Sequence, residues 1–143
     1  RRAFAPMKIL VIDGQGGGLG RAITAALRQA LPDLALIALG TNAIATTSML
    51  KAGAQQGATG ESAIRWQCRD AGLILGPTGL LTAGALLGEI SPAIAAAVGE
   101  SPAKKLLIPS DRCNVQVIGV RPQSMDDAVR ELVARVAEAA GAP

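Results

Sequence analysis

Residues 11–23, VIDGQGGGLGRAI, place five glycines within seven positions directly after an apolar run. Glycine has no Cβ, so a loop of this composition allows a ligand to approach the backbone closely. The first N–H groups of a helix are unpaired donors at the positive end of the helix dipole, and together they favour a phosphate. The stretch therefore predicts a phosphate-containing small molecule as ligand. The alternative is a turn whose glycines only let a strand and a helix pack closely.

The spacing of the glycines narrows the type of loop. Position 19 is leucine, so the loop does not fit G-x-G-x-x-G, whereas Gly14, Gly18 and Gly20 fit G-x-x-x-G-x-G. This pattern resembles the loop of the short-chain dehydrogenases, a resemblance that implies NAD or NADP as cofactor. That family uses a Tyr-x-x-x-Lys pair, and the chain contains no tyrosine. We therefore expect nucleotide or dinucleotide binding without the dehydrogenase chemistry of that family.

The ligand is expected to contact this loop and the neighbouring strand ends. Thr41 and Asn42 follow the second predicted strand, where an acidic residue would accept the ribose hydroxyls of NAD. They could bind a ribose or a 2′-phosphate, which leaves NADP, NAD and other nucleotides open, or one of them only caps the next helix. The predicted cofactor-binding residues are Asp13, Gly14, Gln15, Gly16, Gly17, Gly18, Leu19, Gly20, Thr41, Asn42, Gly76 and Thr78.

The candidates for catalysis are Asp13, Glu61 and Arg112. Asp13 ends a strand, where it could hold a ribose hydroxyl, bind Mg²⁺ or take a substrate proton, or else accept N–H bonds from its own loop. Arg112 either clamps a phosphate or lies in a solvated turn with Asp111. Glu61 and Glu89 are either bases or surface and capping residues.

The chain has no histidine, and Cys68 and Cys113 are too far apart in sequence for a metal knuckle. We predict no metal site and expect both thiols to be buried and inert.

Alternating apolar runs and helical patterns position these residues. Strands are expected at 8–12, 34–39, 73–75, 105–108 and 115–120, and helices at 43–52 and 61–71, around Ile23 and Leu27, and after Ser91, Ser101 and Ser124, with a turn-rich stretch at 53–60. This alternation predicts an α/β fold in which a mostly parallel sheet of about five strands carries helices on both faces. Only residues 109–114 separate the last two strands, which is too short for a parallel crossover. The last strand is therefore expected to be antiparallel, at an edge.

Bulk properties restrict the partners. Residues 1–6 include two arginines and are interpreted as an N-terminal extension or vector remnant, while residues 7–143 are expected to form a single nucleotide-binding domain. Without Arg1 and Arg2, twelve basic residues face eleven acidic ones, so the charge does not predict a nucleic-acid partner. The apolar runs are too short to span a membrane, and a cytoplasmic location is expected. A homo-oligomer is expected, and the apolar segment 80–98 either supplies an exposed surface for it or packs on the sheet.

Several stretches together, KILVIDGQGGGLG, ALGTNAIAT and LLIP among them, are similar to a small family of bacterial proteins known only as a domain of unknown function. The resemblance extends over nearly the whole chain from Met7. It implies a three-layer Rossmann-like domain and assigns no activity. A small enzyme that acts on a phosphorylated metabolite, with Asp13 as base or metal ligand, and a non-catalytic structural or interaction subunit remain alternatives.

Overall fold

The computed structural model describes residues 7–110 and 114–141. The expected N-terminal extension, residues 1–6, lies outside the described residues, as do Asp111, Arg112 and Cys113. The elements are β1 (Ile9–Asp13), α1 (Gly18–Ala30), β2 (Ile37–Gly40), α2 (Ala43–Ala52), β3 (Gln56–Thr59), α3 (Glu61–Cys68), β4 (Leu73–Pro77), the 3₁₀ helix η1 (Thr78–Leu81), α4 (Pro92–Glu100), β5 (Lys104–Ile108) and α5 (Met125–Ala139).

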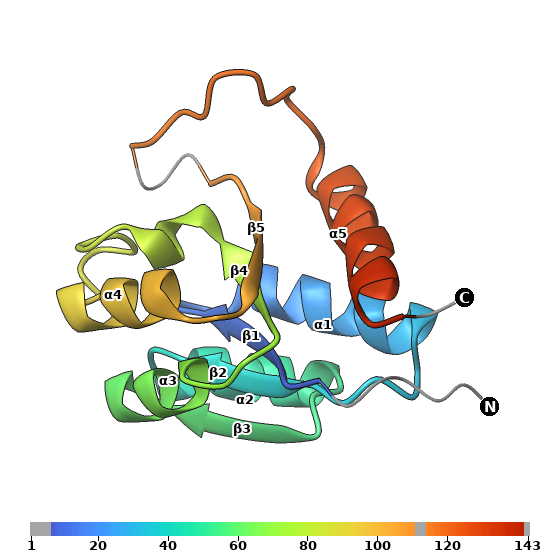
Figure 1. The fold of residues 1–143 in the computed structure, drawn as a ribbon, viewed down its shortest axis with the longest axis horizontal. Coiled ribbons are helices and arrows are strands. Elements are labelled where there is room, and N and C mark those ends of the chain that lie inside the picture. Colours follow the sequence, from blue (N-terminus) through green and yellow to red (C-terminus); the bar gives the residue numbers. More distant parts are fainter. Residues whose placement is uncertain (1–6, 111–113, 142–143) are drawn as a thin grey trace.

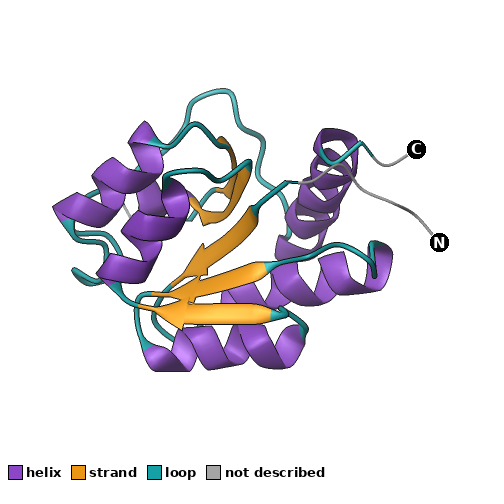
Figure 2. Cartoon of the chain, turned by 60° about the horizontal axis from the view of Figure 1, so that its bottom comes forward, coloured by secondary structure: helices purple, strands orange, loops and turns teal. Residues whose placement is uncertain are grey.

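The strands form one five-stranded sheet in the order β3-β2-β1-β4-β5, and every pair is parallel. Both β1 and β4 are buried along their whole length, as expected of central strands covered on two faces. Figure 2 shows the sheet between two groups of helices. The predicted α/β fold with helices on both faces is confirmed.

Each face of the sheet carries its own apolar core. On one face α1, α2 and α5 pack around Ile23, Leu27 and Met49, all fully buried. On the other face α3 and α4 pack around Ile64, Ile90 and Val98. The two helix groups lie apart in Figure 1, α3 and α4 on the left and α1 with α5 on the right. Among the described residues neither core contains an aromatic side chain, so aliphatic side chains and alanines fill the space between the layers.

The strand β3 was missed by the sequence pattern, which predicts a turn-rich stretch at 53–60. Its sequence, QGAT, has no apolar run, and three of its four residues are exposed. An edge strand needs only one neighbour, and here β2 supplies it, with Ile37 opposite Gln56. Gly57 lets the strand pass close to α2, because a Cβ there would lie 3.0 Å from Leu50 Cδ2.

The predicted antiparallel strand at 115–120 is wrong. Residues 114–124 form no regular element and arch away from the sheet before α5 (Figure 1). Gly119 has a left-handed backbone (φ 93°), and the Val120 N–H bonds to the Val117 carbonyl, so this apolar run contains a turn. The edge strand on this side is β5, which is parallel to β4.

The helices predicted after Ser91 and Ser124 are confirmed, and each of these serines caps its helix. The Ser91 hydroxyl accepts the Ile94 N–H at the start of α4, and the Ser124 hydroxyl accepts the Asp127 N–H at the start of α5. The helix predicted after Ser101 is wrong, because Ser101 ends α4 instead. Its hydroxyl donates to the Cys68 carbonyl at 2.6 Å and accepts the Ala103 N–H, which ties the end of α3 to the chain entering β5.

The apolar segment 80–98 packs mainly on the sheet. Leu80, Ile90, Ile94 and Val98 are buried there, while Leu87 is 95% exposed. None of the helices in the described residues is long and apolar enough to cross a lipid bilayer.

Candidate functional site

The glycine loop, residues 14–20, lies at the carboxyl edge of the sheet and leads from β1 into the first turn of α1. The strand order reverses here, because β2 and β3 lie on one side of β1 while β4 and β5 lie on the other. In open α/β sheets this switch point is where the crevice for a ligand forms. The ends of β1, β2 and β4 therefore bring the loop, Thr41 and the segment after η1 to the same edge.

Three glycines of the loop are required by the protein's own packing. A Cβ at Gly14 would lie 2.7 Å from Thr41 Oγ1 and 2.9 Å from Leu86 Cδ1. One at Gly17 would lie 2.8 Å from the Cα of Ala45, and Gly17 also has a left-handed backbone (φ 72°). These positions permit α1, α2 and the loop to approach closely, which is the architectural interpretation of the sequence. The third glycine of this kind is Gly20, whose Cβ would meet Met49.

Gly16 and Gly18 differ from these three. A Cβ at either position would meet no atom within 4 Å, and neither residue has a left-handed backbone. Both are exposed, and their N–H groups donate to no other residue that the structure describes. Neither packing nor backbone geometry within these residues explains why they are glycines. They leave the N–H groups at the start of α1 uncovered by side chains.

Asp13 is turned into the protein. Its carboxylate accepts the Gly14 N–H at 2.8 Å through Oδ1 and the Gly20 N–H at 2.7 Å through Oδ2, and only 5% of the residue is exposed. The side chain thus joins the start of the loop to the first turn of α1. Burial raises the pKa of Asp13 above its ordinary value, against the opposing effect of the hydrogen bonds from Gly20 and Gly14, and the nearby charge of Glu89 raises it further.

Three donors from two strand ends converge on one oxygen of Glu89. Glu89 Oε1 accepts the Gln15 N–H at 2.9 Å, the Asn42 side-chain amide at 2.9 Å and the Thr41 hydroxyl. We call Gln15 N, Thr41 Oγ1 and Asn42 Nδ2 the donor cluster. Glu89 itself is partly exposed and comes from the segment between η1 and α4. A carboxylate therefore sits where part of a ligand would lie in a nucleotide-binding sheet.

The donor cluster is held in place from behind. Asn42 caps α2, because its Oδ1 accepts the Ala45 N–H at 2.9 Å, and its Nδ2 also donates to the Gln15 carbonyl at 3.0 Å. The Thr41 N–H bonds to the Asp13 carbonyl at 3.0 Å. Capping therefore fixes which end of the Asn42 amide faces the loop. The two interpretations of Asn42, cap and polar group at the site, are compatible.

Burial acts to raise the pKa of Glu89, but the hydrogen bonds from Thr41, Gln15 and Asn42 together outweigh it. The pKa of Glu89 is therefore below its ordinary value, and the carboxylate is charged at neutral pH.

Residues 8–141 match the family described as a domain of unknown function, DUF3842. The chain belongs to this family. The predicted resemblance to a family of unknown function is thus confirmed, and membership assigns the DUF3842 chain no activity. No curated protein matches its sequence.

A solved structure similar to the DUF3842 chain is that of a dodecameric FMN-dependent UbiX-like decarboxylase from Escherichia coli O157:H7. The two sequences are 19% identical, the alignment covers 93% of this chain and 94% of that one, and the TM-score is 0.49. The flavin and the dodecamer are properties of that protein.

The remaining residues predicted from the sequence lie at other points of the fold. Gly76 is required by packing, because a Cβ there would lie 2.3 Å from the Ile12 carbonyl oxygen. The Thr78 hydroxyl accepts the Ser110 N–H at 3.3 Å, at the carboxyl edge on the β5 side. Glu61 begins α3, and its carboxylate accepts the Ser91 hydroxyl, so it joins α3 to α4. Arg112 lies outside the described residues.

Cys68 is buried, and burial raises the pKa of its thiol to about 11. The predicted burial is confirmed for Cys68, and the raised pKa favours an inert thiol. Cys113 is outside the described residues. No group of three or more Cys, Asp or Glu side chains suited to a metal ion occurs among the residues that the structure describes.

Sequence reasoning missed the position of Glu89. It selected Glu89 only as a base or surface residue, because 74 positions separate it from Gln15. A local signal does exist in the polar pair Thr41 and Asn42, two donors that need an acceptor. Only the fold shows which acidic side chain meets them.

Proposed function

We propose that residues 7–143 form one domain that binds a phosphate-bearing ligand of nucleotide type, with a phosphate on the N–H groups at the start of α1. The observation that carries the proposal is the pair Gly16 and Gly18, whose lack of side chains the described structure does not itself require. Their exposed N–H groups lie at the positive end of α1, which stabilises an anion. The position at the reversal of strand order supports the same site.

The ligand class includes NADP, NAD, flavin nucleotides and mononucleotides. The end of β2 supplies donors instead of an acidic residue, and Thr41 and Asn42 direct them at the Glu89 carboxylate. Donors at this position suit an anionic part of any of these ligands.

Thermal unfolding with each candidate ligand tests the proposal. A ligand at about one hundred times its dissociation constant should stabilise the protein by roughly 2.7 kcal/mol. Gly18→Val should abolish this shift, because the new side chain would cover the N–H groups. Gly99→Val is the matched control, since Gly99 also lies in a helix with no atom closer than 4.0 Å to a Cβ. Equal shifts in both variants, or none in the wild type, would contradict the proposal.

The hydrogen bonds and burial of Asp13 support a positioning role for it rather than a catalytic one. Both of its oxygens are occupied by N–H groups of its own loop, and it is buried beneath that loop. The enzyme alternative, with Asp13 as base or metal ligand, gains no support from this geometry.

We also propose that copies of this chain associate. Four apolar side chains of 115–120, namely Val115, Val117, Ile118 and Val120, are 48% to 87% exposed. Monomeric proteins rarely leave such a run uncovered. The segment 80–98, where association was expected, has its large side chains mostly on the sheet and supports this less.

A further inference from the structure

The carboxylate of Glu89 occupies a position built for an anionic oxygen. Gln15, Thr41 and Asn42 each direct a donor at the same atom, Oε1. Hydrogen bonds to an ionised acceptor are stronger than those between neutral groups, so the donor cluster suits a charged oxygen. Gln15 is also the residue directly before Gly16, so the donor cluster adjoins the uncovered N–H groups of Gly16 and Gly18.

The donors and the acceptor differ in how firmly they are held. The donors belong to the ends of β1 and β2 and to the cap of α2, which are tied together by the Thr41 N–H bond and the Asn42 cap. Glu89 lies in a segment without helix or strand, its backbone N–H is bonded to the Leu86 carbonyl, and its side chain is partly exposed. Rotating the Glu89 side chain breaks its three hydrogen bonds to the donor cluster and leaves the backbone in place. Displacing the donors would instead move the ends of two strands and the cap of α2.

We infer that Glu89 is an internal stand-in for a second anionic group of the ligand, and that the ligand class is a diphosphate. One phosphate binds the N–H groups of Gly16 and Gly18, and the adjacent phosphate replaces the Glu89 carboxylate on the donor cluster. This inference rests on the proposed phosphate site. Beyond that site, the inference specifies that the ligand has two adjacent phosphates and that the Glu89 side chain moves when the ligand binds.

Charge explains why displacement is required. With Glu89 in place, a second phosphate would meet a carboxylate at short range and find its three donors already used. Once the Glu89 side chain has rotated away, the same donors can hydrogen-bond to the oxygens of the second phosphate. Glu89 thus competes with a diphosphate for the donor cluster but does not occupy the position of a single phosphate on Gly16 and Gly18.

The test compares inorganic phosphate with inorganic pyrophosphate by calorimetric titration at fixed ionic strength. Glu89→Ala is expected to tighten pyrophosphate binding about tenfold, and phosphate binding by less than about threefold. Thr41→Val, which removes one donor, is expected to weaken pyrophosphate by about fivefold to tenfold and to leave phosphate unchanged. Glu100→Ala is the matched control, because it removes the same unit charge from the exposed end of α4.

The outcomes separate the inference from the proposed function. Weaker pyrophosphate binding in Glu89→Ala would mean that Glu89 holds the ligand, and equal tightening of both anions would mean general electrostatics; either result overturns the inference. If phosphate binds in a Gly18-dependent manner and pyrophosphate gains nothing, the inference fails while the phosphate site stands. If neither anion binds any variant, both fail. Titrations with ADP and NAD then distinguish a terminal from an internal diphosphate, and the same dependence on Glu89 supports the inference with either ligand.

Discussion

Two neighbouring residues of the loop, Gly16 and Gly17, are glycines for different reasons. Gly17 has a left-handed backbone and no room for a Cβ beside Ala45, whereas Gly16 has open space around it. Sequence alone does not separate them, because both are simply glycines within one motif. The separation needs the position of α2, where Ala45 leaves no room for a Cβ at Gly17, while the Ser48 hydroxyl contacts only the carbonyl of Gly16.

Substitution by alanine should reveal this difference. Gly17→Ala is expected to lower the free energy of unfolding by about 1–3 kcal/mol, from backbone strain and the clash with Ala45. Gly16→Ala should change it by less than about 1 kcal/mol. Urea unfolding measures both. Comparable losses at the two positions would show that Gly16 is also required by the fold.

Asp13→Asn tests the positioning role of the carboxylate. One oxygen would become an NH₂ group, which cannot accept the N–H of Gly14 or Gly20. Leaving a buried donor unpaired should destabilise the protein by about 1–3 kcal/mol. Urea unfolding gives this value. An unchanged stability, with loss of ligand binding, would instead indicate that Asp13 faces the ligand.

The pH dependence of stability follows from the lowered pKa of Glu89. A carboxyl whose pKa is lower in the folded state stabilises that state above the ordinary pKa of 4.5, and loses this contribution as the pH falls through the folded value. The stability advantage of the wild type over Glu89→Gln should therefore shrink as the pH falls from neutral through 4.5 and below. Thermal unfolding of both proteins across that range measures it. An advantage that grows on acidification would contradict the hydrogen bonding of Glu89.

At the scale of elements, local signals predicted most of the sheet. A few residues are enough to indicate the structure in three places. These are the uninterrupted apolar run at β1, the capping Ser91 and the glycine-rich turn into α1. In contrast, β3 is a strand because β2 lies beside it, and its own sequence, QGAT, does not favour a strand. The run 115–120 has the opposite problem. Its β-branched residues favour a strand, but within the described structure no neighbouring strand pairs with it.

The Ser91 cap offers a prediction at this scale. Ser91→Ala removes the acceptor of the Ile94 N–H and should reduce the free energy of unfolding by about 1 kcal/mol. The Ser91 hydroxyl also donates to Glu61, so the link between α3 and α4 would weaken with it. Pairing this variant with Glu61→Gln in a double-mutant cycle separates the two contributions. If Ser91→Ala has no effect, the cap does not stabilise α4.

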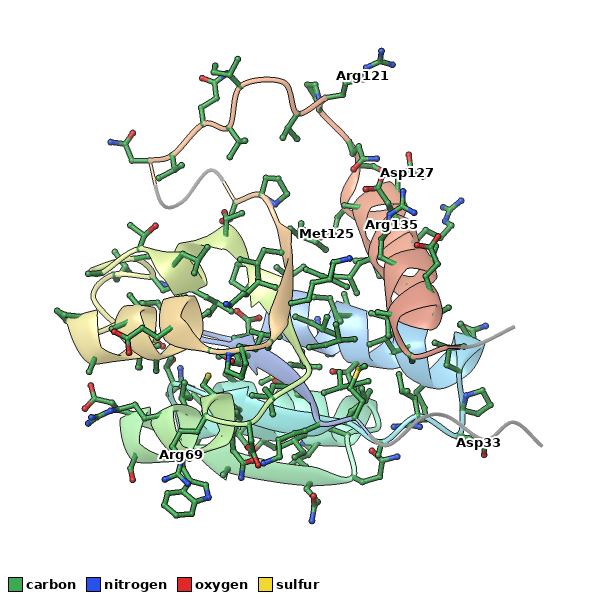
Figure 3. The ribbon with its side chains drawn as sticks, in the orientation of Figure 1. Asp33, Arg69, Arg121, Met125, Asp127 and Arg135 are labelled. Carbon is green, nitrogen blue, oxygen red and sulfur yellow. The ribbon has the colours of Figure 1, made fainter. Side chains whose placement is uncertain are left out.

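For the whole molecule, the exposed run 115–120 makes self-association measurable. Light scattering after size exclusion should show an assembly larger than one chain for the wild type. Ile118→Lys should shift it toward the monomer, because a charge would replace an apolar side chain that is 87% exposed. Ile44→Lys is the control on α2, where Ile44 is 70% exposed. Arg121 directly follows this run and projects outward in Figure 3, so a basic side chain lies at its border. A monomeric wild type would contradict the proposed association.

The sheet order has a consequence for how the chain acquires its structure. The central strand β1 pairs with β4, so Ile9 lies beside Leu73, and each parallel pair is joined through a helix-containing crossover rather than a tight hairpin. During synthesis β4, the second neighbour of β1, is made only after about half of the chain. Until then β1 can pair with β2 alone. Contacts this distant in sequence slow the search for the native topology. Before β4 is available, β1 leaves one apolar edge without a neighbouring strand. The protein is then most prone to aggregation.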